Sequence, residues 1–160
     1  MAIDRPAREV VLNALLQYMR GETRSYGFDD RITPYFNRKG TADEGLRQIA
    51  NALWRIYDDF IDHPISVTAE GWEALRRTLA YLQTDLELAK NCPRQTWPFA
   101  SEQQWHEHQP LAEKLDLPLF DPAIHSRQFR PWWNRIPTSV GVLILLGFLV
   151  PVLILLFFFT

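Results

Sequence analysis

Apolar side chains recur at the spacing of an amphipathic helix in three segments of the N-terminal part of the chain. The first segment predicts a helix from about Arg5 to Arg20, with Asp4 as the N-cap and Gly21 as the C-terminal stop. Its apolar positions extend beyond one face, so this helix either lies at the centre of a bundle or has a second side covered by a partner. These positions are Val10, Val11, Leu12, Ala14, Leu15, Leu16, Tyr18 and Met19.

The second segment predicts a helix that begins with a capping box. In Thr41-Ala42-Asp43-Glu44 the threonine is the expected N-cap and the glutamate the third helical residue. We expect the helix to end at His63-Pro64, because the residue before a proline avoids helical dihedral angles. The apolar face of this helix consists of Leu46, Ile49, Ala50, Leu53, Tyr57 and Phe60.

The third segment predicts a helix that starts after Thr68, and Cys92-Pro93 closes it. Because the connection from the second helix is short, we expect the second and third helices to be antiparallel neighbours. A shorter helical turn is expected near Asp29–Phe36, since a long loop without secondary structure is uncommon in a small domain. The apolar pattern of the third helix is formed by Trp72, Leu75, Leu79, Leu82 and Leu86.

Proline changes the character of the chain between Pro93 and Pro137, a segment that also carries large aromatic rings. A short helix is expected from Ser101 through Trp105, with Pro110 limiting its length. The rings are too many for a free linker, so residues 93–121 are expected to fold back on the helices. Residues 122–137 would then form a stalk.

The C-terminal segment has the length and composition of a transmembrane helix. Residues 140–159 contain no charged side chain, and twenty helical residues span about 30 Å, the thickness of the bilayer hydrocarbon. The start of the chain lacks the pattern of a signal peptide, so one C-terminal span is expected. Arginines before the span indicate a cytoplasmic N-terminal part, and tryptophans prefer the headgroup level. The interface residues are Arg127, Arg130, Trp132, Trp133 and Arg135.

The expected organisation is an all-α protein with a small antiparallel bundle of about three core helices and a short fourth. We divide the chain into a helical core (1–92), an aromatic and proline-rich segment packed on it (93–121), a juxtamembrane stalk (122–137) and a transmembrane helix (138–160).

Composition excludes several classes of protein. The net charge of −2 gives no general footprint for nucleic acid. The single cysteine, Cys92, excludes an internal disulfide framework and a cysteine-based zinc site. The sequence contains no glycine-rich phosphate loop and no serine elbow. We therefore expect no cofactor and no nucleic-acid partner.

Four clustered side chains form the one candidate for metal chemistry: Asp58, Asp59, Asp62 and His63. Asp58-Asp59-x-x-Asp62 is similar to the aspartate-rich motif of prenyl-diphosphate synthases, in which helical carboxylates hold magnesium ions bound to a diphosphate. The similarity ends there, because those enzymes have longer helical chains and a second such motif. A general site with oxygen and nitrogen ligands remains as an alternative.

The structural interpretation of the same cluster is a solvated acidic helix face. Carboxylates at the C-terminal end of a helix oppose its macrodipole, so compensating charges are expected. Arg55 lies three or four positions from two of the aspartates, and Arg76 and Arg77 lie on the helix expected next to them. The hypothesis is an aspartate–arginine network at the corner between the second and third helices.

The sequence thus predicts a single-pass, tail-anchored protein of the cytoplasmic membrane. Its cytoplasmic helical domain would act as a protein-interaction or scaffold module, binding another protein or copies of itself beside the lipid bilayer. The alternative is a small membrane-bound metal-dependent enzyme that uses the aspartate–histidine cluster. A pore-forming effector is disfavoured, since the span has no polar face to line water.

Overall fold

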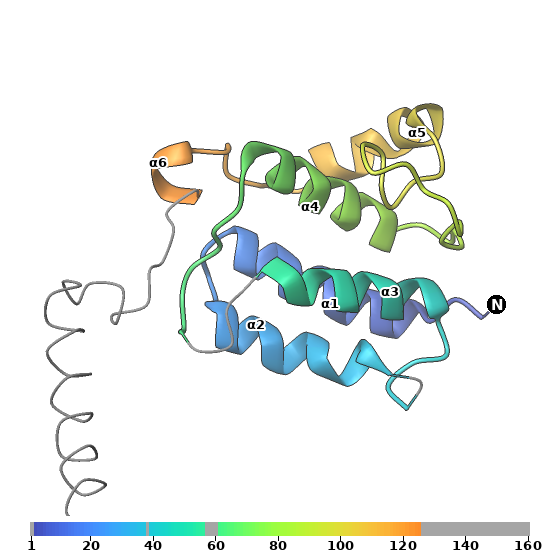
Figure 1. The fold of residues 1–160 in the computed structure, drawn as a ribbon, viewed down its shortest axis with the longest axis horizontal. Coiled ribbons are helices and arrows are strands. Elements are labelled where there is room, and N and C mark those ends of the chain that lie inside the picture. Colours follow the sequence, from blue (N-terminus) through green and yellow to red (C-terminus); the bar gives the residue numbers. More distant parts are fainter. Residues whose placement is uncertain (1, 38, 57–60, 126–160) are drawn as a thin grey trace, which may run out of the picture. The chain divides into compact units, whose positions relative to one another are not determined.

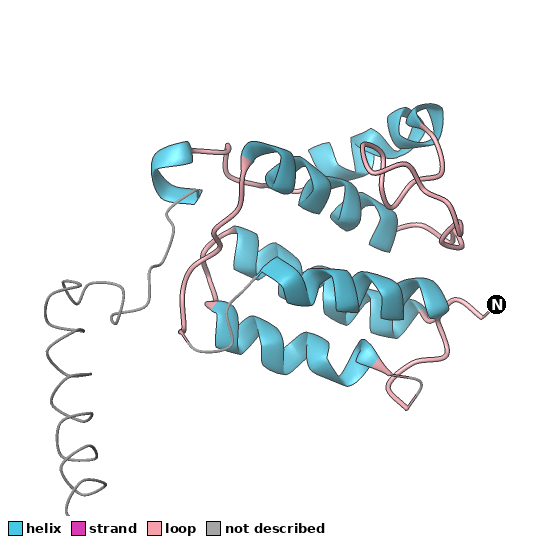
Figure 2. Ribbon diagram, viewed as in Figure 1, coloured by secondary structure: helices cyan, strands magenta, loops and turns pink. Residues whose placement is uncertain are grey.

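Helices account for all regular secondary structure in the part of the chain that the computed structural model describes, which is residues 2–37, 39–56 and 61–125 (Figures 1 and 2). The all-α prediction is confirmed for these residues. They belong to a unit spanning residues 1–128. The elements in chain order are α1 (Arg5–Met19), α2 (Ser25–Ile32), the 3₁₀ turn η1 (Thr33–Phe36), α3 (Glu44–Leu53), the 3₁₀ turn η2 (Trp54–Ile56), α4 (Ala69–Leu82), α5 (Glu102–Glu113) and α6 (Pro122–His125).

Helix α1 lies at the centre of this unit, because α2, α3 and α4 all pack against it. Its ends agree with the prediction. The Asp4 carboxylate accepts a hydrogen bond from the Ala7 N–H at 3.0 Å, and Gly21 follows with φ of 74°, which glycine adopts without strain. Leu12 and Leu16, on the second side of the helix, pack against the core. The chain's own helices therefore cover much of the wide apolar face.

Helix α2 and the turn η1 are longer than the short helical turn that the sequence predicted. Helix formation begins at Ser25 and continues through η1 to Phe36. Phe28 and Ile32 are fully buried, and the Phe28 ring stacks on that of Tyr18 with centroids 4.8 Å apart. Burial of this apolar face against α1 stabilises the additional helical residues, as tertiary packing commonly does for short helices.

The predicted capping box of the second helix is wrong. The N-cap of α3 is Asp43, whose carboxylate accepts a hydrogen bond from the Leu46 N–H at 3.0 Å, and Glu44 is the first helical residue. The Thr41 hydroxyl instead donates to the Asp4 carboxylate at 2.8 Å. Both Thr and Asp are good N-cap residues. Asp43 is the N-cap of α3 because its carboxylate also pairs with a buried arginine of α1.

The second helix also ends earlier than predicted. The α-helical part stops at Leu53, and η2 extends it only to Ile56. Residues 57–60 lie outside the described residues, and residues 61–68 are not helical. Hydrogen bonding to the start of α2 competes with the helix here, since the Ser25 N–H donates to the His63 carbonyl at 2.9 Å.

Helix α4 begins where the sequence predicted and runs antiparallel to α1 (Figure 1). The Thr68 hydroxyl caps it by accepting a hydrogen bond from the Gly71 N–H at 3.1 Å. It ends at Leu82, well before the predicted end at Cys92-Pro93. Helix α4 packs on α1 and α5 and makes few contacts with α3, which corrects the prediction of adjacent second and third helices. The longer connection after η2 lets the chain reach the other side of α1.

Helix α5 continues through a proline that was expected to limit it. The N-cap is Ser101, as predicted, and the helix runs past Pro110 to Glu113. A proline inside a helix removes one backbone hydrogen bond and costs about 3 kcal/mol. Burial of Trp105 and Ala112 on this helix offsets that cost.

Aromatic residues after Pro93 extend the core. Phe99 is fully buried, and its ring makes a T-shaped contact with the Tyr81 ring at a centroid distance of 5.8 Å. Trp97 and Phe120 are partly buried against the same core. The division of the chain at residues 92, 121 and 137 stays a prediction, and the transmembrane helix and most of the stalk lie outside the described residues.

Candidate functional site

Asp62 does not lie on the acidic helix face that the sequence predicted. Its carboxylate sits at the N-terminus of α2, where it accepts a hydrogen bond from the Tyr26 N–H at 3.2 Å and pairs with Arg24, Nε to Oδ2, at 3.0 Å. Negative charge is favourable at that end of a helix. Asp58 and Asp59 lie outside the described residues.

His63 holds the same helix end. Its side chain is buried, with Nδ1 2.6 Å from the Pro64 carbonyl oxygen, and its backbone N–H donates to the Ser25 hydroxyl at 2.9 Å. Within residues 2–37, 39–56 and 61–125, no three His, Cys, Asp or Glu side chains converge to hold a metal ion. The two described members of the candidate cluster, Asp62 and His63, thus serve to position α2.

The arginines of α4 have partners other than Asp62. Arg76 pairs with Glu73 one turn earlier, Nη1 to Oε2, at 3.0 Å. Arg77 donates from Nε to the Trp97 carbonyl at 3.1 Å. The part of the hypothesised network that would join Asp62 to these two arginines is therefore not formed, because α4 packs away from α3.

The remaining predicted residues fall at or beyond the edges of the described chain. Arg55 lies in η2, whereas the two aspartates expected beside it are not described. In the described ranges, no helix is both long and apolar enough to cross a membrane. The predicted membrane-interface residues also lie outside the described chain: Arg127, Arg130, Trp132, Trp133 and Arg135.

A fully buried ion pair joins α1 to the start of α3. Arg8 is 0% exposed, and its Nε lies 2.7 Å from Oδ2 of Asp43. The guanidinium also donates from Nη1 to the Thr84 carbonyl at 2.7 Å and from Nη2 to the Leu86 carbonyl at 3.0 Å. It lies over the Tyr81 ring, 5.0 Å from the centroid. One side chain therefore ties together three segments that are distant in the sequence.

The electrostatics of the Arg8–Asp43 pair indicate a structural role. Burial alone would raise the pKa of Asp43, but hydrogen bonds and charge from Arg8 outweigh it and hold the pKa below the ordinary value. The sequence contained one indication of the pair. Arg8 lies three positions before Val11 and seven before Leu15, so it shares the buried face of α1 with them. The Arg8 side chain is fully buried, so its guanidinium is closed to solvent.

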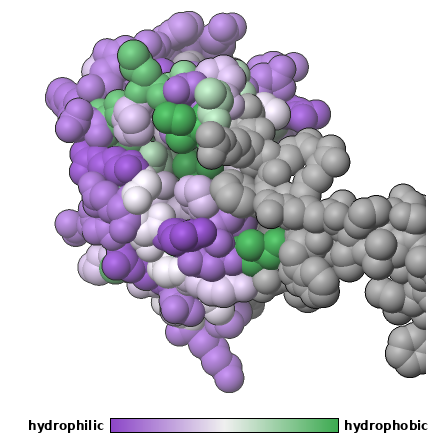
Figure 3. Space-filling model, turned by 90° about the vertical axis from the view of Figure 1, so that its left-hand side faces the viewer, coloured by the Kyte–Doolittle hydropathy of each residue, from purple (hydrophilic) through white to green (hydrophobic). Residues whose placement is uncertain are grey.

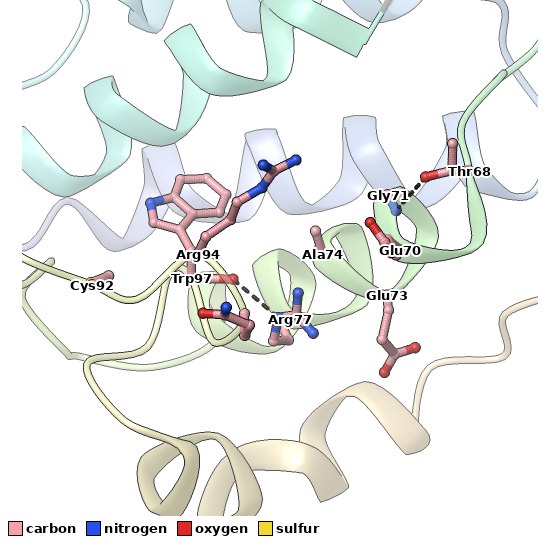
Figure 4. A pocket seen from close by; sticks show the side chains of 10 residues that line it. Thr68, Glu70, Gly71, Glu73, Ala74, Arg77, Cys92, Arg94 and Trp97 are labelled. Carbon is pink, nitrogen blue, oxygen red and sulfur yellow. Dashed lines mark hydrogen bonds between the residues drawn. The ribbon is translucent and has the colours of Figure 1, made fainter.

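A cavity of about 950 Å³ opens between α4 and the loop that follows Cys92 (Figure 4). In Figure 4 the Trp97 ring and the Arg94 side chain come from the loop, while Arg77 and Glu73 come from α4. The lining residues are Thr68, Glu70, Gly71, Glu73, Ala74, Arg77, Cys92, Arg94, Gln95 and Trp97.

Arg77 is the buried charge of this cavity. The residue is only 9% exposed, and its single hydrogen bond within the described chain leaves from Nε. Burial lowers the pKa of Arg77, and the nearby charge of Glu73 opposes this effect in part. The two Nη groups, the outer end of the guanidinium, donate to no described residue.

Trp97 also borders a second, smaller cavity, of about 460 Å³, on the side of α3. Its side chain therefore stands between two concave regions, one against α4 and one against α3. The second cavity is lined by Glu44, Arg47, Gln48, Asn51, Ala52, Arg55 and Trp97.

The residues of the larger cavity include charged, polar and apolar side chains. They include no serine or histidine that could form a nucleophile–base pair. The Cys92 thiol donates to the carbonyls of Ala89 and Pro98, each at 3.3 Å, and burial raises its pKa, so it is protonated at neutral pH. The cavity therefore offers charge and apolar surface for a ligand.

Two exposed apolar side chains lie in α6 or shortly before it, and Figure 3 shows hydrophobic areas among hydrophilic ones on the face that it views. Leu119 is 91% exposed and Ile124 is 57% exposed. His125 holds the segment in place, because its ring packs against both Trp72 and Phe120, at centroid distances of 4.4 and 5.6 Å. This segment presents apolar surface at the start of the predicted stalk, whose first residues form α6.

Comparisons of the chain with known protein families, with characterised proteins and with solved structures find no match. The functional argument therefore rests on the residues of this chain.

Proposed function

We propose that this chain is an integral protein of the cytoplasmic membrane, anchored by residues 138–160, whose helical unit lies in the cytoplasm and binds another protein or a second copy. The observation that carries the proposal is the uncharged apolar run at residues 140–159. Its length matches the bilayer hydrocarbon. The arginine- and tryptophan-containing flank before it favours a cytoplasmic N-terminal part.

Two features of the helical unit support a role in protein interaction. The cavities on either side of Trp97 offer concave, charged surface without a nucleophile–base pair. Leu119 and Ile124 add exposed apolar side chains elsewhere on the unit. Interfaces combine apolar contacts with such placed charges.

The anchoring is tested by washing membranes that contain the full chain with alkaline sodium carbonate. The full chain is expected to stay in the pellet, whereas a variant lacking residues 138–160 is expected in the supernatant. Release of the intact full chain would overturn the proposal.

The interaction is tested by crosslinking in cells followed by purification in detergent. A crosslinked partner or a defined oligomer is expected. A strictly monomeric protein without crosslinked products would contradict the interaction role but leave the anchoring intact.

A metal-dependent enzyme remains the alternative interpretation of Asp58, Asp59, Asp62 and His63. The hydrogen bonds of the last two residues hold α2, which does not favour this alternative. Metal analysis of protein purified without chelator separates the two functions, since one bound transition-metal ion per chain would support the enzyme.

A further inference from the structure

We propose that the cavity between α4 and the 92–97 loop binds a short acidic segment of a partner protein, with one carboxylate bound by Arg77 and a neighbouring apolar side chain against Trp97. The inference rests on the proposed interaction function and identifies the site and the chemistry of the partner.

Arg77 provides the anion-binding group. Arg77 is 9% exposed and lines the cavity, yet within the described chain only its Nε has a hydrogen-bond acceptor. A carboxylate presents two acceptor oxygens that match the planar fork of a guanidinium. The Nη atoms of Arg77 are not fully buried, so a carboxylate that enters the cavity can accept hydrogen bonds from them.

The surroundings of Arg77 favour an anion at this end of the cavity. Glu73 is the nearest carboxylate on α4, but it already pairs with Arg76 through both oxygens, at 3.0 and 3.1 Å. Arg94 lies exposed on the loop and adds positive charge at the rim. Figure 4 shows the Trp97 ring beside the Arg94 side chain, so the charge and an aromatic surface come from the same loop.

The other end of the cavity limits the kind of anion. Glu70, at the start of α4, is exposed and lines the cavity seven positions before Arg77, which is about 10 Å along a helix at 1.5 Å per residue. An extended negative surface, such as nucleic acid or an anionic membrane, would bring negative charge against Glu70. A single carboxylate flanked by apolar or neutral residues avoids that repulsion.

The size of the cavity agrees with a short peptide segment. Its volume of about 950 Å³ lies near the upper end of the range of about 300–1,000 Å³ that is usual for ligand sites. The wall formed by Trp97 suits an aromatic or aliphatic side chain next to the carboxylate, because tryptophan provides a large apolar contact area.

The first experiment measures fluorescence anisotropy of labelled peptides with the full chain in non-ionic detergent. The probe is fluorescein-Gly-Ser-Leu-Glu-Leu-Ser-Gly, and the matched peptides carry glutamine or lysine in place of glutamate. The glutamate peptide is expected to bind about tenfold or more tightly than the glutamine peptide, as for other hydrogen bonds to charged groups. Equal binding of the three peptides, or no binding, would overturn the proposal.

Substitutions test whether the peptide binds in this cavity. Arg77→Gln is expected to remove the preference for glutamate. Because this buried position affects folding, the exposed variant Arg94→Glu gives a second measurement and is expected to weaken binding about threefold or more by loss of rim charge. The matched control is Arg31→Glu on α2, an exposed residue that makes the same charge change away from the cavity. Equal weakening by the control would show a general charge effect and contradict the site.

Alkylation of the single cysteine tests independently where the peptide binds. Cys92 lines the cavity, so the glutamate peptide is expected to slow its alkylation by iodoacetamide at least threefold, and the glutamine peptide is not. Inorganic phosphate and phosphatidylserine vesicles are the competing probes, and stronger protection by either one would contradict a peptide ligand. If the peptide does not bind but crosslinked partners are still found, only the proposed peptide site is refuted. If the peptide binds but no partner is found in cells, the proposed interaction function is refuted.

Discussion

Arg8 and Asp43 show how much one buried pair contributes at the scale of single residues. Removing the carboxylate by Asp43→Ala leaves the Arg8 guanidinium buried without its anion, and such changes cost about 3–5 kcal/mol of unfolding free energy. Urea unfolding of purified protein measures the loss. Asp85→Ala is the control, because Asp85 pairs with Arg5 at 2.6 Å but is 75% exposed. Its effect is expected to be much smaller, and equal effects would contradict the importance of burial.

The same pair predicts a pH dependence. The pKa of Asp43 is lower in the folded protein than the ordinary value of 3.8. The contribution of Asp43 to stability is therefore fully present above that ordinary pKa, and it is lost as the pH falls through the lower folded-state pKa. Urea unfolding at a series of acidic pH values is expected to show a fall in wild-type stability that is shallower in Asp43→Asn. Parallel curves for the two proteins would contradict the assignment.

Two buried tyrosines allow a paired test of hydrogen bonding. The Tyr18 hydroxyl is buried without a hydrogen-bond partner in the described chain, whereas the Tyr81 hydroxyl donates to the Leu86 carbonyl at 2.8 Å. Tyr18→Phe is expected to raise the unfolding free energy by about 1 kcal/mol, and Tyr81→Phe to lower it by about 1 kcal/mol. Thermal unfolding measures both, and equal destabilisation by the two variants would show that Tyr18 has a hydrogen-bond partner in solution.

Elements are held by contacts from distant parts of the chain. Asp62 and His63 hold the N-terminus of α2. Helix α6 is held by the contact of the His125 ring with Trp72 of α4 and by a hydrogen bond from the Val67 N–H, just before α4, to the His125 carbonyl at 2.6 Å. Short helices are marginal alone. These contacts explain why α2 and α6 form although their sequences give weak helix signals.

The attachment of α6 can be measured by hydrogen exchange. His125→Ala removes ring contacts with Trp72 and Phe120, each worth about 0.5–1.5 kcal/mol, so exchange of the Val67 amide is expected to become about tenfold faster. The amides of α1 are expected to be unaffected. His106→Ala replaces an exposed histidine and is the control. Uniform acceleration throughout the chain would indicate global destabilisation instead.

The charges before the apolar run decide the orientation of the whole molecule in the proposed membrane arrangement. Replacing Arg127, Arg130 and Arg135 together by glutamate removes the positive flank, which is the main determinant of cytoplasmic retention. Protease treatment of inverted membrane vesicles is expected to digest the N-terminal unit of the wild type and to leave part of the variant protected. Arg20→Glu, distant in sequence from the run, is the control.

In the described part of the chain, the sequence predicted several of the core helices but not the cavities. The caps at Asp4, Thr68 and Ser101 were predicted correctly because a cap depends on a few neighbouring residues. The cavity around Trp97 was not predicted, since it depends on a loop that returns to α4 from twenty positions further along the chain.

The sequence by itself determined the all-helical class, the position of α1, the starts of α4 and α5 and the apolar C-terminal run, because local side-chain pattern and capping specify these features. Only the tertiary structure decided that the Asp62 carboxylate accepts a hydrogen bond at the N-terminus of α2, that Asp43 rather than Thr41 caps α3, and that Arg77 lines a cavity. Each of these outcomes depends on which of several equally suitable local partners is brought close by packing. Spacing along the chain contains no information on that choice.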